Sequence, residues 1–199
     1  ERSAGGDGAR LQAGRRPGGH SPQSQDNTRR GVGSGERCEL VRHGNGASRG
    51  KSDLVPVLAA LYDASRPVIL IGGLVSRKQM EKLRPRLEKL GVPLMTVSSS
   101  IDRVQTNSYL YAGRPGTWGG QRSANILIAQ CDCLIACGVQ LDLQQTGFNW
   151  QNYAPNAQIF QIYPDYAELQ KGHPELALGI NCSPDEALTH IGTEYASDG

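Results

Sequence analysis

The sequence predicts one α/β domain, in which a parallel sheet is covered by helices on both faces, with a disordered tail before it. From residue 53 onward, short apolar runs alternate with helical patterns, an order typical of a parallel sheet with crossover helices. Apolar runs without polar interruption are typical of strands buried on both faces. The length of 199 residues leaves room for one ordinary domain and a tail. We therefore expect a tail over residues 1–52, a domain over residues 53–193 and a short C-terminal tail over residues 194–199.

The first 50 residues differ in composition from the rest of the chain. They hold nine Arg and no Lys against five acidic residues, twelve of the 25 Gly, and no aromatic residue. Such a segment cannot bury enough apolar surface to offset a backbone entropy loss of about 1–2 kcal/mol per residue. An arginine-rich tail could bind RNA, but the Arg-Gly pairs are scattered and no aromatic residue lies between them. The pattern favours a solvated tail, a linker or an incorrectly translated stretch over a nucleic-acid partner.

Composition also argues against a membrane protein and a disulfide-rich one. No apolar run approaches the roughly 18–20 residues that a membrane-spanning helix needs, and the polar start does not resemble a secretory signal. Of five Cys, an odd count, Cys131, Cys133 and Cys137 lie in apolar sequence. This placement favours reduced, buried thiols in a cytoplasmic protein. The His and Cys residues lack the spacing of metal ligands, so we expect no metal site in this chain.

The first predicted helix begins at Asp53, whose side chain can cap it. Its apolar residues share one face: Leu54, Val57, Leu58 and Leu61. Residues 65–67 end the helix, residues 68–71 follow as a buried strand, and Gly72-Gly73 turns the chain.

The second predicted helix begins with Ser76 and Gln79, which have the spacing of a capping box. Pro85 should kink this helix or split it. Gly91 stands where a C-cap glycine belongs, and residues 92–97 follow as the next strand.

The same alternation continues to the C-terminus. A helix follows Gly119-Gly120, and Ser183, Pro184 and Glu186 have the pattern of a helix start for the last helix. Three more strands are predicted, the last one weakly: residues 133–138, 157–163 and 176–181.

Ligands of open parallel sheets bind at the carboxyl ends of the strands, where the strand order reverses. Four segments are expected there: Gly72-Gly73, residues 98–100, Gly138-Val139-Gln140, and Tyr163-Pro164-Asp165.

The loop over residues 113–120 is a fifth candidate, because its four glycines and Thr117 precede a helix whose N-terminus could hold a phosphate. Asp165 or Asp142 could bind a ribose hydroxyl, and either could instead be an ordinary turn or helix cap. Glycines after strands are also needed for the turns themselves.

Several stretches together resemble the central domain of thiamine diphosphate-dependent enzymes. They are residues 65–73, 89–93, 115–117 with 123–125, 131–138, 142–147 and 153–157. The resemblance covers about residues 53–192 and is strongest to the acetolactate synthase group, particularly its relatives in sugar and surface-polysaccharide pathways.

The resemblance implies a Rossmann-like domain with a six-stranded sheet, placed between two further domains. Those flanking domains bind thiamine diphosphate and Mg²⁺ across a subunit interface and supply the catalytic Glu and the metal ligands. The parent enzyme would decarboxylate a 2-oxo acid and act as a carboligase within a homo-oligomer. No residue of this chain is then expected to be catalytic.

The resemblance also implies a possible FAD site in this domain. The matching positions are Gly72, Gly73, Gly116, Thr117, Gly138, Val139 and Asp165. Four positions depart from the family pattern. Gln140 and Gln144 stand where relatives carry Arg, and Tyr163 and Ser183 stand where relatives carry an acid. Losing one charge-assisted contact costs about 1.5–3 kcal/mol. A free-standing FAD- or NAD-binding module and a non-catalytic assembly domain therefore stay open as alternatives.

Overall fold

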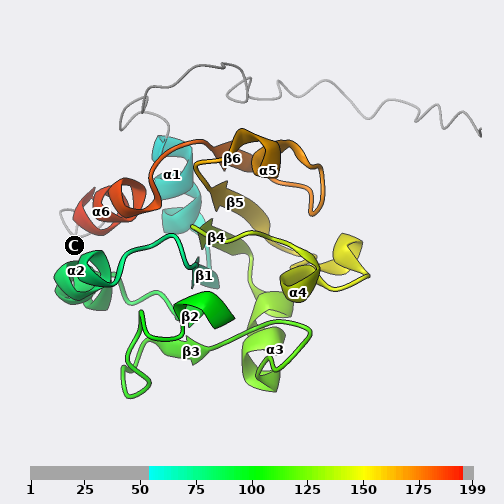
Figure 1. The fold of residues 1–199 in the computed structure, drawn as a ribbon. Helices are drawn as coiled ribbons and strands as arrows, with labels where there is room; N and C mark the ends of the chain where they lie inside the picture. Colours follow the sequence, from blue (N-terminus) through cyan, green and yellow to red (C-terminus); the bar gives the residue numbers. More distant parts are fainter. Residues whose placement is uncertain (1–53, 195–199) are drawn as a thin grey trace, which may run out of the picture. The chain divides into compact units, whose positions relative to one another are not determined.

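The computed structural model describes residues 54–194 (Figure 1). The predicted tail over residues 1–52, the expected cap Asp53 and residues 195–199 lie outside the described residues. The elements run in this order: α1 (Val55–Asp63), β1 (Pro67–Ile71), α2 (Arg77–Leu90), β2 (Leu94–Thr96), η2 (Ser98–Ser100), β3 (Tyr111–Gly113), α3 (Arg122–Gln130), β4 (Cys133–Cys137), α4 (Leu143–Thr146), η3 (Trp150–Asn152), β5 (Gln158–Ile162), α5 (Tyr166–Gln170), β6 (Leu178–Ile180) and α6 (Pro184–Glu194).

The six strands form one parallel sheet in the order β3-β2-β1-β4-β5-β6. The central pair β1 and β4 is in register over five residues, with Ile69 opposite Ile135. The expected fold class is confirmed. The apolar runs predicted every strand except β3, which has only three residues, two of them half-buried.

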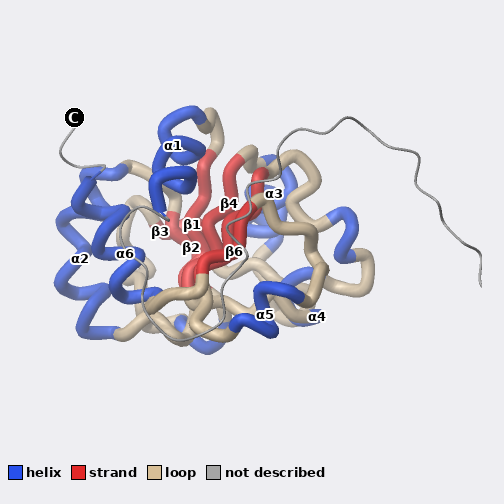
Figure 2. Tube along the Cα trace, turned by 90° about the horizontal axis from the view of Figure 1, so that it is seen from above, coloured by secondary structure: helices blue, strands red, loops and turns tan. Residues whose placement is uncertain are grey.

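Two hydrophobic cores lie on the two faces of the sheet, because successive side chains of a strand point to opposite sides. Ile69 and Ile71 of β1 belong to the core that α1, α2 and α6 cover. Val68 and Leu70 belong to the other core, with α3. Figure 2 shows the strands between these two helical layers. Each fully buried Leu or Ile side chain contributes about 1.5–3 kcal/mol, so the strand runs hold the layers together.

Helix α2 starts and ends near the predicted positions. The Ser76 hydroxyl accepts a hydrogen bond from the backbone N–H of Gln79 at 3.2 Å, and Gly91 adopts a positive φ of 69° at the C-cap. The reciprocal half of the expected capping box is replaced, because the backbone N–H of Ser76 donates to Asp185 Oδ1 at 2.8 Å. The Gln79 side chain instead donates to Thr189 on α6.

Pro85 does not split α2, which runs for 14 residues without interruption. Pro85 and Glu81, whose carbonyl loses its helical partner to the proline, are both exposed. Water can therefore solvate that carbonyl. At α1, the N-cap position falls on Leu54, which makes no side-chain cap.

Three cysteines confirm the expectation of buried, reduced thiols. Cys131, Cys133 and Cys137 are free and buried. Burial, helped by the nearby Asp132 carboxylate, raises the pKa of Cys131 to about 11 and that of Cys133 to about 12. Between residues 54 and 194, no helix combines the length and hydrophobicity that a bilayer crossing requires.

Candidate functional site

The strand order reverses between β1 and β4, because the chain continues outward from β1 through β2 and β3, and from β4 through β5 and β6. At the carboxyl ends of these strands lies a cleft of about 410 Å³. This volume is within the range of small-molecule sites. Its lining residues are Gly73, Leu74, Val97, Ser98, Ser99, Gly138, Val139, Gln140, Asp142, Gln144, Gln145 and Tyr163.

Five of the nine predicted site residues line this cleft together: Gly73, Gly138, Val139, Gln140 and Tyr163. They come from the loops after β1, β4 and β5 and meet because the carboxyl ends of parallel strands share one edge of the sheet. The other four, Gly72, Gly116, Thr117 and Asp165, are not among the lining residues.

Gly72 is required by packing between two strand ends. A Cβ at this position would lie 1.9 Å from the carbonyl oxygen of Gly138. The backbone N–H of Gly72 donates to Cys137 O at 2.8 Å, which extends the β1–β4 pairing by one residue. At Gly73, a Cβ would meet the hydroxyl of Ser99 at 2.7 Å. Packing alone therefore explains why glycine occupies both positions, without any ligand.

The glycine-rich loop before α3 docks on α4. The backbone N–H of Thr117 donates to Gln144 O at 2.8 Å, and its hydroxyl donates to the same oxygen at 3.0 Å. The backbone N–H of Gly116 donates to the side chain of Asn125 at 2.9 Å. These donors are used inside the protein, so they do not form a phosphate cradle.

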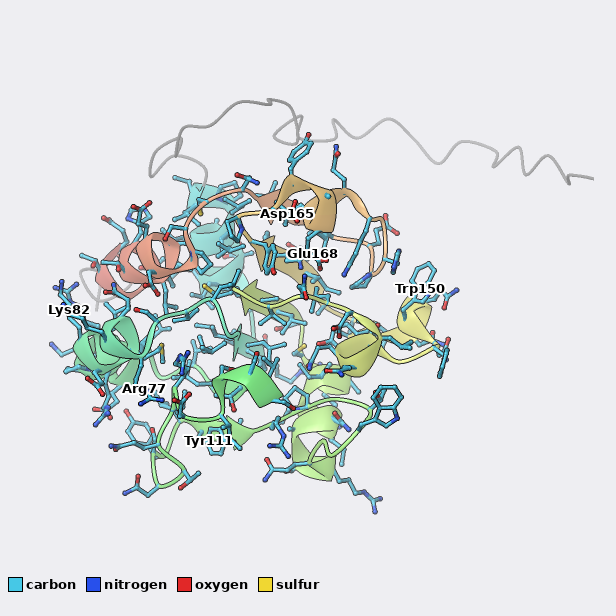
Figure 3. All side chains as sticks on the ribbon, in the orientation of Figure 1. Arg77, Lys82, Tyr111, Trp150, Asp165 and Glu168 are labelled. Carbon is cyan, nitrogen blue, oxygen red and sulfur yellow. The ribbon has the colours of Figure 1, made fainter. Side chains whose placement is uncertain are left out.

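Both candidate ribose-binding acids act as helix caps. Asp142 Oδ1 accepts from the backbone N–H groups of Gln144 and Gln145 at the start of α4. Asp165 Oδ1 accepts from the N–H of Ala167 at 2.9 Å on α5, where Figure 3 labels it. Of the two, only Asp142 also lines the cleft.

Tyr163 and Gln140, two of the departures from the family pattern, face one another. Burial raises the pKa of the Tyr163 hydroxyl, and the Glu168 and Asp165 carboxylates raise it further. A hydrogen bond with the Gln140 side chain opposes the rise. The Tyr163 hydroxyl therefore stays protonated at neutral pH and can both donate and accept.

A buried polar network behind the cleft did not emerge from the sequence patterns. The Gln161 side chain, 0% exposed, donates to Val139 O and to Glu168 Oε1, each at 2.9 Å. Glu168, labelled in Figure 3, also accepts from the N–H of Leu141, whose carbonyl accepts from Lys171. The network fixes the loop after β4 that forms one wall of the cleft. In the sequence, this network was indicated only by Gln161, a polar residue in the otherwise apolar run of β5.

The lining side chains can bind a ligand through hydrogen bonds and apolar contact. Six of them carry a hydroxyl or a carboxamide: Ser98, Ser99, Gln140, Gln144, Gln145 and Tyr163. Across residues 54–194, no group of three or more His, Cys, Asp or Glu is arranged to hold a metal ion.

An open parallel sheet with helices on both faces and a cleft at its switch point defines a doubly wound α/β domain, the class in which ligands bind at that point. Comparison with known families narrows this class. Residues 54–191 match the family described as "Thiamine pyrophosphate enzyme, central domain". The chain belongs to this family, and the resemblance stated from its motifs is confirmed.

Curated relatives include enzymes of two kinds. A sulfoacetaldehyde acetyltransferase of Alcaligenes xylosoxydans xylosoxydans is 33% identical over 154 residues, which are 72% of this chain and 24% of that protein. The acetolactate synthase isozyme 2 large subunit of Escherichia coli K12 is 30% identical over 112 residues, 56% of this chain and 20% of the relative. An acetolactate synthase large subunit of Cyanidium caldarium is 31% identical over 121 residues, which are 59% of this chain and 20% of that protein. The chain thus spans about a quarter or less of the length of these relatives.

Proposed function

We propose that this chain is the central domain of a thiamine diphosphate-dependent 2-oxo-acid decarboxylase or carboligase that resembles acetolactate synthase. The observation that carries the proposal is the family match over residues 54–191, nearly the whole described domain. The names of the relatives, acetolactate synthase and an acetyltransferase, support two-carbon acyl chemistry in the parent enzyme.

In this proposal, two flanking domains bind thiamine diphosphate and Mg²⁺, and the present domain supplies scaffold and a ligand cleft. When bound, thiamine diphosphate serves as the electron sink for decarboxylation of a pyruvate-like acid. The cytoplasmic location and the homo-oligomeric state expected from the sequence belong to the same proposal.

Exposed apolar side chains beside the cleft support contact with a flanking domain. Trp118, Leu143 and Phe148 are 66%, 41% and 84% exposed. They flank the place where Thr117 contacts α4 and Gly147. Large exposed apolar side chains that gather in one place are typical of interaction surfaces.

The test uses the natural gene product that contains residues 54–191. Intact-mass analysis should give a product much larger than the 21.4 kDa of the 199-residue chain. That product should release CO₂ from pyruvate only when thiamine diphosphate and Mg²⁺ are present, whereas the 199-residue chain should show no turnover. A natural product of 21.4 kDa, or turnover by the 199-residue chain, would overturn the proposal.

A second candidate is a free-standing nucleotide-binding module of the same fold, with FAD or NAD as ligand. The cleft of about 410 Å³ favours it. This candidate predicts that purified protein carries a bound chromophore or nucleotide, visible by absorbance and mass spectrometry. A colourless, ligand-free protein that only assembles with other subunits would instead indicate a non-catalytic assembly domain.

A further inference from the structure

The cleft at the switch point contains one charged side chain, the carboxylate of Asp142. No Lys, Arg or His is among its lining residues, all of which belong to the described residues 54–194. Phosphate groups are usually held by cationic side chains or by unused N–H groups at a helix N-terminus. The cleft itself offers no cation to a diphosphate.

The helix end that this fold offers to a diphosphate has a carboxylate of the chain itself beside it. In open α/β domains, the diphosphate of a dinucleotide lies at the N-terminus of the helix after the first strand. Here that helix is α2, and the N–H of Ser76 donates to Asp185 Oδ1 at 2.8 Å. The N–H of Gln79 donates to the Ser76 hydroxyl at 3.2 Å. A carboxylate from α6 therefore lies at the N-cap of α2, where it would repel a phosphate.

The cations near the carboxyl edge do not line the cleft. Arg114 donates through Nη2 to Gly119 O within its own loop at 2.8 Å, its buried Nε has no partner among the described residues, and it is not among the lining residues of the cleft. Arg77 forms an ion pair with Asp102, and Figure 3 shows the labelled Lys82 of α2 at the outer side of the fold. The diphosphate of FAD, which the family resemblance implied, does not fit the residues present.

The polar groups of the cleft suit an uncharged ligand with hydroxyl groups. The buried Oε1 of Gln145 has no hydrogen-bond partner among the described residues, and a hydroxyl can both donate and accept, whereas a phosphate oxygen only accepts. Asp142 caps α4 through Oδ1 and keeps a second carboxylate oxygen, an acceptor of the kind that binds ribose hydroxyls. Leu74, which is 47% exposed, adds apolar surface against which a flat ring can lie, and the largely buried Val97 and Val139 form the apolar floor beside it.

We infer that the cleft takes an uncharged nucleoside, with its ring against the apolar side chains and its ribose on the carboxamides and Asp142, and excludes the diphosphate of a flavin dinucleotide. This inference rests on the ligand role that the proposed function gives to the cleft.

The test is isothermal titration calorimetry of the 199-residue chain with adenosine, ADP and FAD as probes. Adenosine should bind about tenfold or more tightly than ADP, and its Kd should be independent of salt, because no ion pair forms. FAD should not remain bound through gel filtration. Binding of ADP or FAD as tightly as adenosine, or no measurable binding of adenosine, would overturn the inference.

A matched pair of variants isolates the charge of the cleft. Gln140→Arg places a guanidinium at the cleft and should shift the ratio of ADP affinity to adenosine affinity about tenfold or more towards ADP, because ADP gains a cation whereas adenosine loses the Gln140 carboxamide. Gln158→Arg adds the same charge at the exposed start of β5, at the opposite edge of the sheet, and should leave both affinities unchanged. Equal ratios of ADP affinity to adenosine affinity in the two variants would contradict the inference.

The two proposals fail separately. Thiamine diphosphate-dependent turnover by the natural product is measured without nucleoside, so a failed titration leaves that proposal standing. Absence of turnover in the natural product, with adenosine still bound by the chain, would refute the enzyme proposal alone.

Discussion

Gly72→Ala should be the most damaging single methyl addition at the carboxyl edge of the sheet. The new Cβ would lie 1.9 Å from Gly138 O and 2.6 Å from the nitrogen of Val139. Ordinary contact begins at 3.4 Å, so the ends of β1 and β4 must separate by about 1.5 Å. That movement breaks the 2.8 Å hydrogen bond from Gly72 N–H to Cys137 O.

The expected loss of unfolding free energy has two parts. Overpacking a buried contact costs about 1–3 kcal/mol, and leaving buried backbone groups without partners costs about 1–3 kcal/mol more. A total of about 2–6 kcal/mol would lower the Tm of a domain of this size by roughly 6–24 °C. The clash is with backbone, so rotation of a side chain cannot relieve it.

Two other glycines provide graded controls. At Gly91, φ is +69° and nothing lies within 4 Å of the position that an added methyl group would take, so Gly91→Ala should cost only the left-handed backbone penalty of about 1–2 kcal/mol. At Gly73, the contact is the rotatable Ser99 hydroxyl, so Gly73→Ala should also cost less than Gly72→Ala. Urea unfolding, followed by circular dichroism, measures all three. A Gly72→Ala protein within about 1 kcal/mol of wild type, or more stable than Gly91→Ala, would refute the reasoning; failure of Gly72→Ala alone to fold would support it.

Three further predictions concern charged and thiol side chains. Asp185→Ala should cost about 1.5–3 kcal/mol in urea unfolding, because the N–H at the start of α2 loses a charged acceptor. Glu186→Ala removes another acid from the first turn of α6 but not this contact, so it should cost less than about 1 kcal/mol. Glu168→Ala should cost about 1–3 kcal/mol, because it removes the acceptor of the Leu141 N–H and one of the two acceptors of the Gln161 carboxamide. The exposed Glu175→Ala serves as its control, and equal effects would contradict the network. The pKa of Cys131 is about 11 in the folded protein against an ordinary value of 9.0, so the folded state holds the thiol proton longer and its stability should fall as pH rises from 9 towards 11. Unfolding at pH 8 and pH 10 checks this expectation, and a Cys131→Ala protein with an undiminished fall would disprove the assignment.

The local sequence pattern was sufficient to predict those elements whose burial or ends depend on residues close in sequence. Strands β1 and β4 are buried on both faces, so their apolar runs are uninterrupted and identify them directly. Gly91 ends α2 as predicted, because a left-handed C-cap is a local requirement of the helix. The alternation of strands and helices also predicted a ligand site at the carboxyl edge of the sheet, and five predicted residues meet in the cleft there.

Contacts distant in sequence decided the remaining features. Strand β3 has only the residues Tyr111–Gly113 and exists through its pairing with β2, so no local pattern predicts it. Asp185 accepts from the N–H of Ser76 at the start of α2 from 109 residues away, and so replaces the reciprocal half of the expected capping box. Thr117 likewise donates to α4 instead of a ligand. A sequence pattern states which backbone groups need a partner, but only the folded chain determines which distant side chain is near enough to become that partner.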